Sequence, residues 1–288
     1  MADLRKTVTR STRLGPDERV AAIEVLKRKE LDILVIGGGI VGTGAALDAV
    51  TRGLSVGMVE ARDWSSGTSS RSSKLVHGGI RYLEQLDFRL VREALIERGL
   101  LLQRLAPHLV KPVRFLYPLT KPVIERLYVG AGMLLYDLFS YTGGRKPGVP
   151  HHRHLTRRQL LRAAPSLAND AFVGGLTYYD AQVDDARYVA TLARTASFYG
   201  AHVASRVRVE GFIKVGQRVV GVNAHDLETG ERFEIRARQV VNATGVWTDD
   251  TQSMVGERGQ FKVRASKGVH LVVPRDRFQS NGGVILRT

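Results

Sequence analysis

Residues 31–42 decide the fold, and they read Leu31-Asp-Ile-Leu-Val-Ile36 followed by Gly37-Gly-Gly39-Ile-Val-Gly42. An apolar, β-branched run that ends directly at glycines is typical of a buried parallel strand. Residues 40–52 then carry small side chains at helical spacing and end at Gly53, which predicts a helix. Residues 54–59 predict a second strand. The stretch therefore predicts a strand–helix–strand unit and an α/β fold.

The glycines match the pattern G-x-G-x-x-G in a meaningful context, between a predicted strand and a predicted helix. Gly37 permits a tight turn, Gly39 lets the backbone approach a pyrophosphate, and Gly42 lets the helix pack close to the strand. Glu60 ends the second strand, where a carboxylate accepts both ribose hydroxyls of an adenosine and repels a 2′-phosphate. We therefore expect a dinucleotide site that disfavours NADP. The glycine spacing leaves NAD and FAD open.

The serine- and glycine-rich segment that follows Glu60 indicates a tightly bound cofactor rather than one that is released after each turnover. It reads Thr68-Ser-Ser-Arg-Ser-Ser-Lys-Leu-Val-His-Gly-Gly79, and its hydroxyls and backbone donors suit a cofactor that is wrapped by the chain. A nicotinamide enzyme would normally continue here to its next strand and helix. A flexible serine-rich loop is the alternative on composition alone.

The composition is that of a globular protein, because 43% of the 288 residues are hydrophobic and 25% are charged. The chain has no cysteine, which excludes disulfides, thiolate zinc sites and iron–sulfur clusters. Any electron chemistry therefore belongs to a bound cofactor. No stretch reaches the roughly 20 predominantly apolar residues of a membrane span.

The net charge of +15 is clustered in two basic stretches, at 145–162 and 256–288. Neither stretch has the interleaved aromatic residues or the helix-turn-helix spacing that reads bases, so we expect no nucleic acid as a partner. A solvated basic surface is one explanation of the charge. Attraction to an anionic substrate or an anionic membrane surface is the other.

The rest of the chain alternates between helices and strands, with an insertion between about 70 and 185. Further helices are predicted over 18–29, 88–105, 156–164 and 184–199. Strands are predicted over 219–225, 232–236 and 239–242, of which the first two form a hairpin and the third runs into Ala243-Thr-Gly245. The apolar segment 127–139 is either a buried core helix or a membrane contact.

Several blocks, taken together, resemble the FAD-dependent glycerol-3-phosphate dehydrogenases. The first is the serine-rich block 68–83, which ends in Gly-Gly-Ile-Arg-Tyr-Leu83 and follows the glycine pattern and Glu60. The other blocks are Phe88-Arg-Leu-Val-x-Glu-Ala-Leu95, Tyr179-Asp-Ala-Gln-Val-Asp-Asp-Ala-Arg187, Val241-Asn-Ala-Thr-Gly-Val-Trp247 and Ser266-Lys-Gly-Val-His-Leu-Val-Val-Pro-Arg275. The resemblance covers about residues 31–288. The glycines and the Ala-Thr-Gly turn alone indicate only the wider class of amino-acid-oxidase-like flavoproteins.

The resemblance implies a glutathione-reductase-type, Rossmann-like FAD-binding domain with an inserted, incomplete antiparallel-sheet substrate domain. The expected parts are a polar arm over 1–30, the FAD-binding domain over 31–85 and 181–250, a helical and substrate-domain insertion over 86–180, and the start of the substrate-domain sheet over 251–288. The family pattern continues well beyond Thr288. The chain is therefore expected to be either a fragment or a naturally short form.

The activity implied by the resemblance is oxidation of sn-glycerol 3-phosphate to dihydroxyacetone phosphate by hydride transfer to FAD, with electrons passed to a membrane quinone. The basic clusters suit a phosphorylated substrate. The implied location is cytoplasmic, with peripheral contact to the inner face of the cell membrane. The sequence does not indicate the oligomeric state. Another flavoprotein of the class, acting on a 2-hydroxy acid or an amine, and an inactive FAD-binding fragment are the alternatives.

Family positions carried onto this chain assign FAD contacts to the glycine pattern, the serine-rich block and the late Ala-Thr-Gly turn. The residues so assigned are Gly37, Gly39, Gly42, Glu60, Ser69, Ser70, Ser73, Lys74, Leu75, His77, Gly79, Val207, Ala243, Thr244 and Gly245.

Three residues match family positions at the substrate. Arg81 is expected to clamp a phosphate or carbinol oxygen, Tyr82 to contact the substrate, and His270 to take the proton of the C2 hydroxyl. A surface ion pair for Arg81, core packing for Tyr82 and a packed strand histidine for His270 are the alternatives. No metal site is expected, because arginines flank the candidate histidines His151, His152 and His154 and repel cations.

Overall fold

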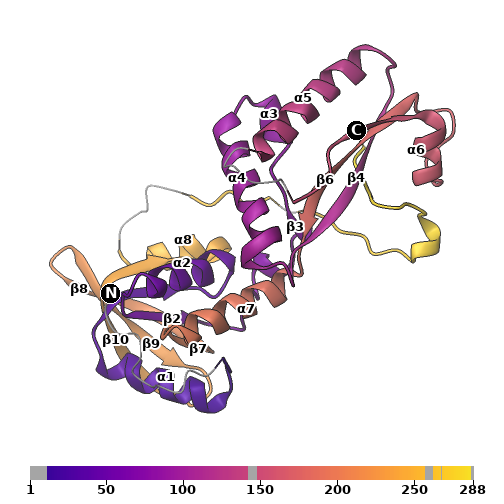
Figure 1. Cartoon of the computed structure of the whole chain (residues 1–288). Coiled ribbons are helices and arrows are strands. Elements are labelled where there is room, and N and C mark those ends of the chain that lie inside the picture. Colours follow the sequence, from indigo (N-terminus) through magenta and orange to yellow (C-terminus); the bar gives the residue numbers. More distant parts are fainter. Residues whose placement is uncertain (1–11, 142–147, 257–261, 267, 287–288) are drawn as a thin grey trace. The chain divides into compact units, whose positions relative to one another are not determined.

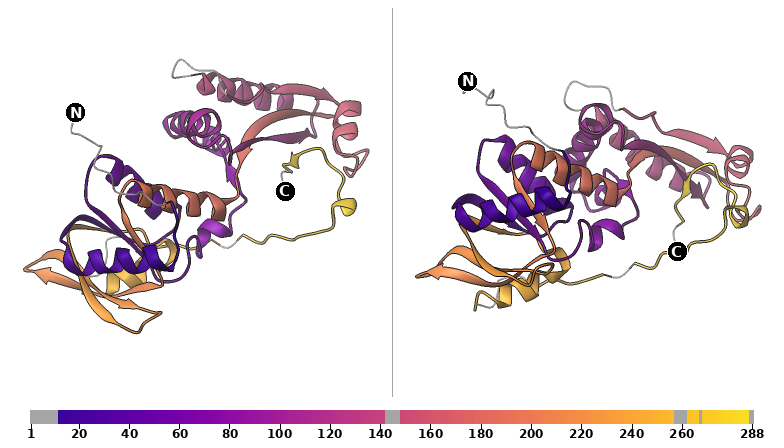
Figure 2. Two further views of the ribbon diagram at one scale, coloured as in Figure 1. Left: turned by 60° about the horizontal axis from the view of Figure 1, so that its bottom comes forward. Right: turned by 90° about the horizontal axis from the view of Figure 1, so that it is seen from below.

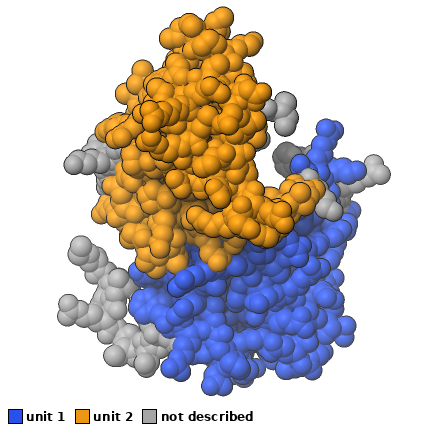
Figure 3. Space-filling model, turned by 90° about the vertical axis from the view of Figure 1, so that its right-hand side faces the viewer, with its two compact units in different colours: residues 1–72, 185–267 blue, residues 73–184, 268–288 orange. Residues whose placement is uncertain are grey.

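The computed structural model describes residues 12–141, 148–256, 262–266 and 268–286, and it divides into two compact units (Figures 1 and 3). Unit 1 consists of residues 1–72 and 185–267, and unit 2 of residues 73–184 and 268–288. Each unit has its own sheet and its own hydrophobic core. Residues 1–11 of the expected polar arm, and Arg145 of the first basic cluster, lie outside the described residues.

The described part of unit 1 forms a six-stranded sheet with helices on both faces (Figures 1 and 2). In spatial order its strands are β7 (His202–Ser205), β2 (Val56–Glu60), β1 (Leu31–Ile36), β10 (Arg232–Asn242), β9 (Arg218–Asp226) and β8 (Val207–Val215). Its helices are α1 (Pro16–Arg28), α2 (Ile40–Thr51), α7 (Asp185–Phe198) and α8 (Thr248–Ser253). Strands β7, β2, β1 and β10 run parallel, while β10, β9 and β8 are joined antiparallel.

Alternation along β1 separates two cores in unit 1. Leu34 is buried with Ile23 and Leu26 of α1 on one face, and Val35 is buried with residues of α2 and α7 on the other. Both faces of the parallel part are therefore covered, as a parallel sheet requires. Ile36 at the carboxyl end of β1 is paired with Asn242 at the carboxyl end of β10. The turns that follow these two strands therefore lie side by side at one edge of the sheet.

Unit 2 is built on a mostly antiparallel sheet. Its strands in spatial order are β11 (Gly283–Val284), β4 (Lys111–Leu119), β6 (Gly174–Gln182) and β3 (Leu75–Val76), with β5 (Arg153–Thr156) also paired to β6. Its helices are α3 (Arg81–Glu84), α4 (Phe88–Leu100), α5 (Ile124–Ser140) and α6 (Arg157–Ala163). Helices α4 and α5 share one core cluster with β4 and β6, and α6 packs in a second cluster with β5.

The strand–helix–strand prediction for the first 60 residues is confirmed by β1, α2 and β2. The prediction of separate strands over 232–236 and 239–242 is wrong, because β10 is one continuous strand. Its residues alternate between the two faces without interruption: Ile235 and Ala237 are fully buried, while Arg236 and Arg238 are exposed. Its first half pairs antiparallel with β9 and its second half parallel with β1.

The helix predicted over 18–29 is observed as α1, which buries Ile23 and Leu26 against the sheet. Two other segments differ from what the sequence suggests. Helix α5 is buried on one face only, and its opposite face exposes large apolar side chains. Residues 268–274, expected to start the substrate sheet, form neither helix nor strand, and among the described residues from 262 onward only β11 forms a strand, which pairs with β4. Across the described residues, helices fall short of the length and apolar character that crossing a membrane requires.

Candidate functional site

The glycine cradle, residues 37–42, is shaped by close approaches that only glycine allows. Gly37 has φ of +110°, and a Cβ there would lie 2.5 Å from the carbonyl oxygen of Ala243. A Cβ on Gly42 would lie 1.9 Å from the carbonyl oxygen of Gly37. Helix α2 therefore begins directly against the turn, with Gly39 as its N-cap residue. Its N-terminal N–H groups and dipole are suited to an anion such as a pyrophosphate.

Glu60 lies at the carboxyl end of β2, beside the cradle. Its Oε2 accepts a hydrogen bond from the Gly38 N–H at 2.7 Å, and its Oε1 accepts one from the Arg62 N–H at 2.7 Å. Only 9% of the residue is exposed. Each oxygen of an ionised carboxylate has room for a second donor, so Glu60 can still accept the two hydroxyls of a ribose.

The serine-rich block reaches the cradle through Ser69. Its Oγ accepts a hydrogen bond from the Ile40 N–H at 2.9 Å, and a Cβ on Gly39 would lie 3.2 Å from the same atom. Ser70, in the same short 3₁₀ turn, donates to the carbonyl oxygen of Gly67 at 3.4 Å. A hydroxyl thus lies at the N-terminus of α2, where a phosphate oxygen would be recognised.

The late Ala-Thr-Gly turn closes the cradle from the neighbouring strand. The Ala243 N–H donates to the carbonyl oxygen of Ile36 at 2.9 Å. Thr244 donates its hydroxyl to Oδ1 of Asn242 at 2.7 Å, and Gly245 has φ of +59°. The structure therefore brings this turn, predicted from a distant part of the sequence, directly onto the first glycine of the cradle.

Two tryptophans that the sequence did not assign to the site lie against Gly38 and Arg62. A Cβ on Gly38 would lie 2.6 Å from the ring of Trp64, and the guanidinium of Arg62 lies 4.5 Å from the ring centre of Trp247. Val207 at the start of β8 is 1% exposed and packs in the core. Its side chain faces the core, so any contact of Val207 with a cofactor would come from its backbone.

The remaining assigned residues belong to unit 2. Lys74 has φ of +59°, its carbonyl oxygen accepts from the Val183 N–H at 3.0 Å, and its Nζ lies 3.7 Å from Asp184. Ser73 and His77 are exposed, whereas Leu75 is half-buried in β3. These residues flank β3, which hydrogen-bonds to the end of β6.

Of the expected substrate residues, Arg81 begins α3, and Tyr82 in the next position is 38% exposed. Gly79 has φ of +69°, and a Cβ there would lie 2.4 Å from the Tyr82 ring, which therefore packs over this turn. His270 is exposed and lies in the irregular segment 268–274. The structure thus puts Arg81 and Tyr82 on one short helix and does not give His270 the strand environment expected for it.

The histidines of the first basic stretch hydrogen-bond to protein groups. His152 Nδ1 lies 2.7 Å from Asp137 Oδ2, and His151 Nδ1 lies 3.3 Å from the same oxygen. Desolvation, together with electrostatic interactions with the neighbouring His152 and Arg126, lowers the pKa of His154. Among the described residues, no group of three or more histidines, aspartates or glutamates could hold a metal ion.

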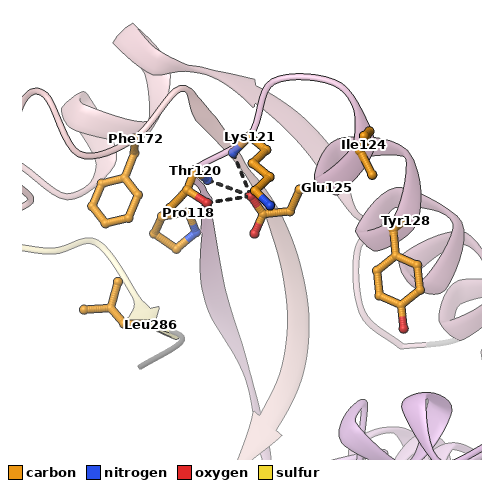
Figure 4. A pocket seen from close by; sticks show the side chains of 8 residues that line it. All are labelled: Pro118, Thr120, Lys121, Ile124, Glu125, Tyr128, Phe172 and Leu286. Atoms are coloured by element: carbon orange, nitrogen blue, oxygen red, sulfur yellow. Dashed lines mark hydrogen bonds between the residues drawn. The ribbon is translucent and has the colours of Figure 1, made fainter.

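A hollow in unit 2 lies between the end of β4 and the start of α5 (Figure 4). Glu125 accepts hydrogen bonds there from the backbone N–H groups of Thr120 and Lys121, at 2.7 and 2.8 Å. Its carboxylate is thus occupied with closing the turn into α5. None of the residues assigned from the sequence lines this hollow.

Comparison with known proteins agrees with the chemistry of the cradle. The sequence profile of the FAD dependent oxidoreductase family (DAO) matches residues 32–286. The chain is 57% identical over 275 residues to the glycerol-3-phosphate dehydrogenase of Mycobacterium leprae, in an alignment that covers 96% of this chain and 46% of the relative. It is 36% identical to the alpha-glycerophosphate oxidase of Streptococcus pyogenes, covering 94% of this chain and 45% of that protein. The chain therefore spans about half the length of these relatives.

Among solved structures, the glycerol-3-phosphate dehydrogenase from Bacillus halodurans complexed with FAD is 32% identical, with a TM-score of 0.62. The match covers 85% of this chain and 39% of that one. L-proline dehydrogenase from P. horikoshii, at 24% identity and a TM-score of 0.62, shares the fold. With a family profile that spans residues 32–286 and a cradle built for a pyrophosphate, this chain belongs to the DAO family of FAD-dependent oxidoreductases.

Proposed function

We propose that the chain is the FAD-binding and substrate-facing part of an enzyme that oxidises sn-glycerol 3-phosphate to dihydroxyacetone phosphate. The observation that carries the proposal is the cradle itself, in which Gly37, Glu60, Ser69 and Ala243 converge on the N-terminus of α2. This cradle occurs in a chain 57% identical, over 96% of its length, to a glycerol-3-phosphate dehydrogenase.

In this proposal Glu60 accepts the ribose hydroxyls of FAD, and the amides at the start of α2 with Ser69 bind its pyrophosphate. The remaining contacts with FAD come from the late turn, from backbone atoms at Val207 and from the serine-rich block. The residues concerned in the turn and the block are Ala243, Thr244, Gly245, Ser70, Ser73, Lys74, Leu75, His77 and Gly79. FAD, when bound, supplies the acceptor for the hydride that leaves C2 of the alcohol.

The substrate contacts are proposed for Arg81, Tyr82 and His270. The guanidinium of Arg81 binds an oxygen of the phosphate or the carbinol, and Tyr82, the next residue of α3, contacts the substrate. His270 accepts the proton that the C2 hydroxyl loses as the carbonyl forms. The net charge of +15 supports the choice of an anionic substrate.

A membrane quinone is the proposed electron acceptor, reached by peripheral contact of the protein with the inner face of the cell membrane. The exposed apolar residues Ile124, Leu127, Leu134 and Leu138 of α5, which are 77%, 69%, 63% and 61% exposed, support such a contact. A surface of this kind suits the boundary between headgroups and acyl chains.

The test is a visible absorption spectrum of the FAD-loaded chain before and after anaerobic addition of glycerol 3-phosphate. We expect the flavin bands to bleach in the wild-type chain. In Arg81→Ala we expect bleaching to slow by about tenfold or more while FAD stays bound, because the role proposed for Arg81 is to bind the substrate and not the cofactor. Arg89→Ala is the matched control, since the Arg89 side chain is 90% exposed and, among the described residues, pairs with Glu93 on its own helix.

Two results would contradict the assignment. Loss of FAD from Arg81→Ala would mean that Arg81 belongs to the cofactor site rather than the substrate site. Bands that persist in the wild-type chain would favour an FAD-binding protein without this activity.

A further inference from the structure

Three polar side chains from three different elements meet in the core of unit 2. They are Arg98 of α4, Tyr136 of α5 and Asp180 of β6, and all three are nearly fully buried, at 1%, 1% and 3% exposure. Arg98 Nη1 donates to Asp180 Oδ1 at 2.6 Å, and the Tyr136 hydroxyl donates to the same oxygen at 2.7 Å. A single carboxylate oxygen thus ties both helices to the sheet.

The cluster is directed at one backbone group of the serine-rich block. The Gly78 N–H donates to the Tyr136 hydroxyl at 2.9 Å and also lies 3.2 Å from Asp180 Oδ1. Packing fixes the same point, because a Cβ on Gly78 would lie 2.3 Å from Cδ2 of Leu95 and 2.5 Å from the Tyr136 hydroxyl. Gly78 is therefore held both by hydrogen bonds and by close contact.

The surroundings keep the Tyr136 hydroxyl protonated. Burial raises the pKa of the Tyr136 hydroxyl well above its ordinary value, and the neighbouring Asp180 carboxylate raises it further. Tyr136 therefore stays a neutral donor to Asp180 while it accepts from Gly78. Arg98 also donates to the carbonyl oxygen of Tyr179 at 3.1 Å, which holds the guanidinium against β6.

Stability alone is a weak reason for such a cluster. A buried ion pair is often no more stabilising than well-packed apolar side chains, because both charges lose their hydration. Nε of Arg98 is buried without a hydrogen-bond partner among the described residues, which adds to that cost. An apolar replacement of the cluster, however, would leave the Gly78 N–H buried and unpaired.

We propose that Arg98, Tyr136 and Asp180 are positioning residues that fix the Gly78–Gly79 turn and, through it, the placement of His77 on one side and of Arg81 and Tyr82 on the other. The turn is short: Gly78 is one residue from His77 and three from Arg81, and Tyr82 already packs over Gly79. A small displacement of the Gly78 backbone would therefore also displace His77 before it and Arg81 and Tyr82 after it. The last link rests on the proposed function of His77, Arg81 and Tyr82.

The first arm of the test needs no cofactor. In the FAD-free full chain carrying Tyr136→Phe, which removes one hydroxyl and little volume, amide hydrogen exchange at Gly78 should become about five- to tenfold faster. Thr177→Val is the matched control. Thr177 lies on β6, the strand that also carries Asp180, and is 3% exposed. Its hydroxyl accepts a hydrogen bond from Arg114 rather than from Gly78. Exchange at Gly78 should stay at the wild-type rate in this control.

The second arm uses the FAD-loaded chain and anaerobic glycerol 3-phosphate. Tyr136→Phe should slow the bleaching of the flavin by about tenfold, as expected for reacting groups that are slightly misplaced, whereas Thr177→Val should bleach at the wild-type rate. Asp180→Asn should change both readouts in the same direction as Tyr136→Phe.

The outcomes separate this proposal from the proposed function. Unchanged exchange at Gly78 in Tyr136→Phe overturns the proposal, and so does faster exchange accompanied by wild-type bleaching. If the wild-type chain itself does not bleach, the proposed function fails, and the exchange result then decides alone whether the cluster positions the turn.

Discussion

At the scale of single residues, the cradle depends on glycines whose missing side chains make room for backbone atoms. Gly42 is the extreme case, since the carbonyl oxygen of Gly37 occupies the place where its Cβ would be. Backbone atoms cannot rotate out of the way as a side chain can. The contact therefore fixes how closely α2 approaches the turn, and with it the position of the N–H groups that would face a pyrophosphate.

We predict that Gly42→Ala weakens FAD binding and lowers the free energy of unfolding by about 1–3 kcal/mol, as overpacking does. Gly44→Ala is the control on the same helix, because a Cβ at Gly44 meets nothing within 4 Å. That control should gain about 0.5–1 kcal/mol, since alanine favours a helix over glycine. FAD titration and urea unfolding measure both effects. Normal FAD binding by Gly42→Ala would show that the close contact does not shape the site.

The residues of the cradle were predictable because their geometry is local. Gly37, Gly42 and Glu60 lie within one strand–helix–strand unit, so their spacing in the sequence fixes their spacing in space. The role of Ser69 at the start of α2 needed the resemblance, since composition alone leaves a serine-rich loop open. Arg98 and Asp180 lie 82 positions apart in the chain, and nothing in the local pattern indicates that these two charges form a buried pair.

At the scale of elements, α1 is joined to the sheet of unit 1 by one buried arginine. Nε of Arg19 donates to the carbonyl oxygen of Ser205 at 2.9 Å, and Nη1 donates to Asp226 Oδ2 at 3.3 Å. The side chains of Arg19 and Asp226 are 10% and 3% exposed. The helix was predictable from its own pattern, but its docking was not, because these partners lie in the second half of the chain.

We predict that Arg19→Met lowers the free energy of unfolding of unit 1 by about 3–5 kcal/mol, because it leaves the Asp226 carboxylate buried without its partner. Arg28→Ala on the same helix should change it by less than about 1 kcal/mol, since Arg28 pairs with Glu24 at the surface. Urea unfolding of both variants measures the difference. Equal effects would mean that α1 is held by its apolar face alone.

The same pair predicts a dependence on pH. Burial on its own would raise the pKa of Asp226, but hydrogen bonds from Arg19 and from the Glu228 N–H outweigh it and lower the pKa. The stability from this group is therefore present above the unfolded pKa of about 3.9 and is lost as pH falls through the lowered folded value. In Arg19→Met the folded pKa of Asp226 should lie closer to its unfolded value, so the loss of stability on acidification, measured by urea unfolding at several pH values, should be smaller than in the wild-type chain.

At the scale of the whole molecule, the chain passes three times between two units that have separate cores. Sequence patterns predicted the α/β part of unit 1, where each strand and helix follows its neighbour. They predicted unit 2 less well, because its strand β6 pairs with β3, β4 and β5, which lie elsewhere in the sequence. The block 266–275, which the resemblance implied to start the substrate sheet, shows a related limit: residues 268–274 form no strand, and a strand needs a partner for its backbone groups.

The two tryptophans of the chain, Trp64 and Trp247, both belong to unit 1. Tryptophan emission therefore reports the unfolding of unit 1, whereas far-ultraviolet ellipticity reports both units. ADP carries the ribose and pyrophosphate that Glu60 and the cradle are proposed to bind, and it lacks the flavin ring that would quench the emission.

We predict that ADP at about 100 times its dissociation constant stabilises unit 1 by about 2.7 kcal/mol. The transition seen by tryptophan emission should shift to higher urea, while a second transition, seen only by ellipticity, should stay in place. Gly42→Ala should abolish the shift, since it distorts the proposed ADP site. A single transition that shifts equally in both signals would show instead that the two units unfold as one cooperative body, so that cofactor bound at the cradle stabilises the turn at Gly78 as well.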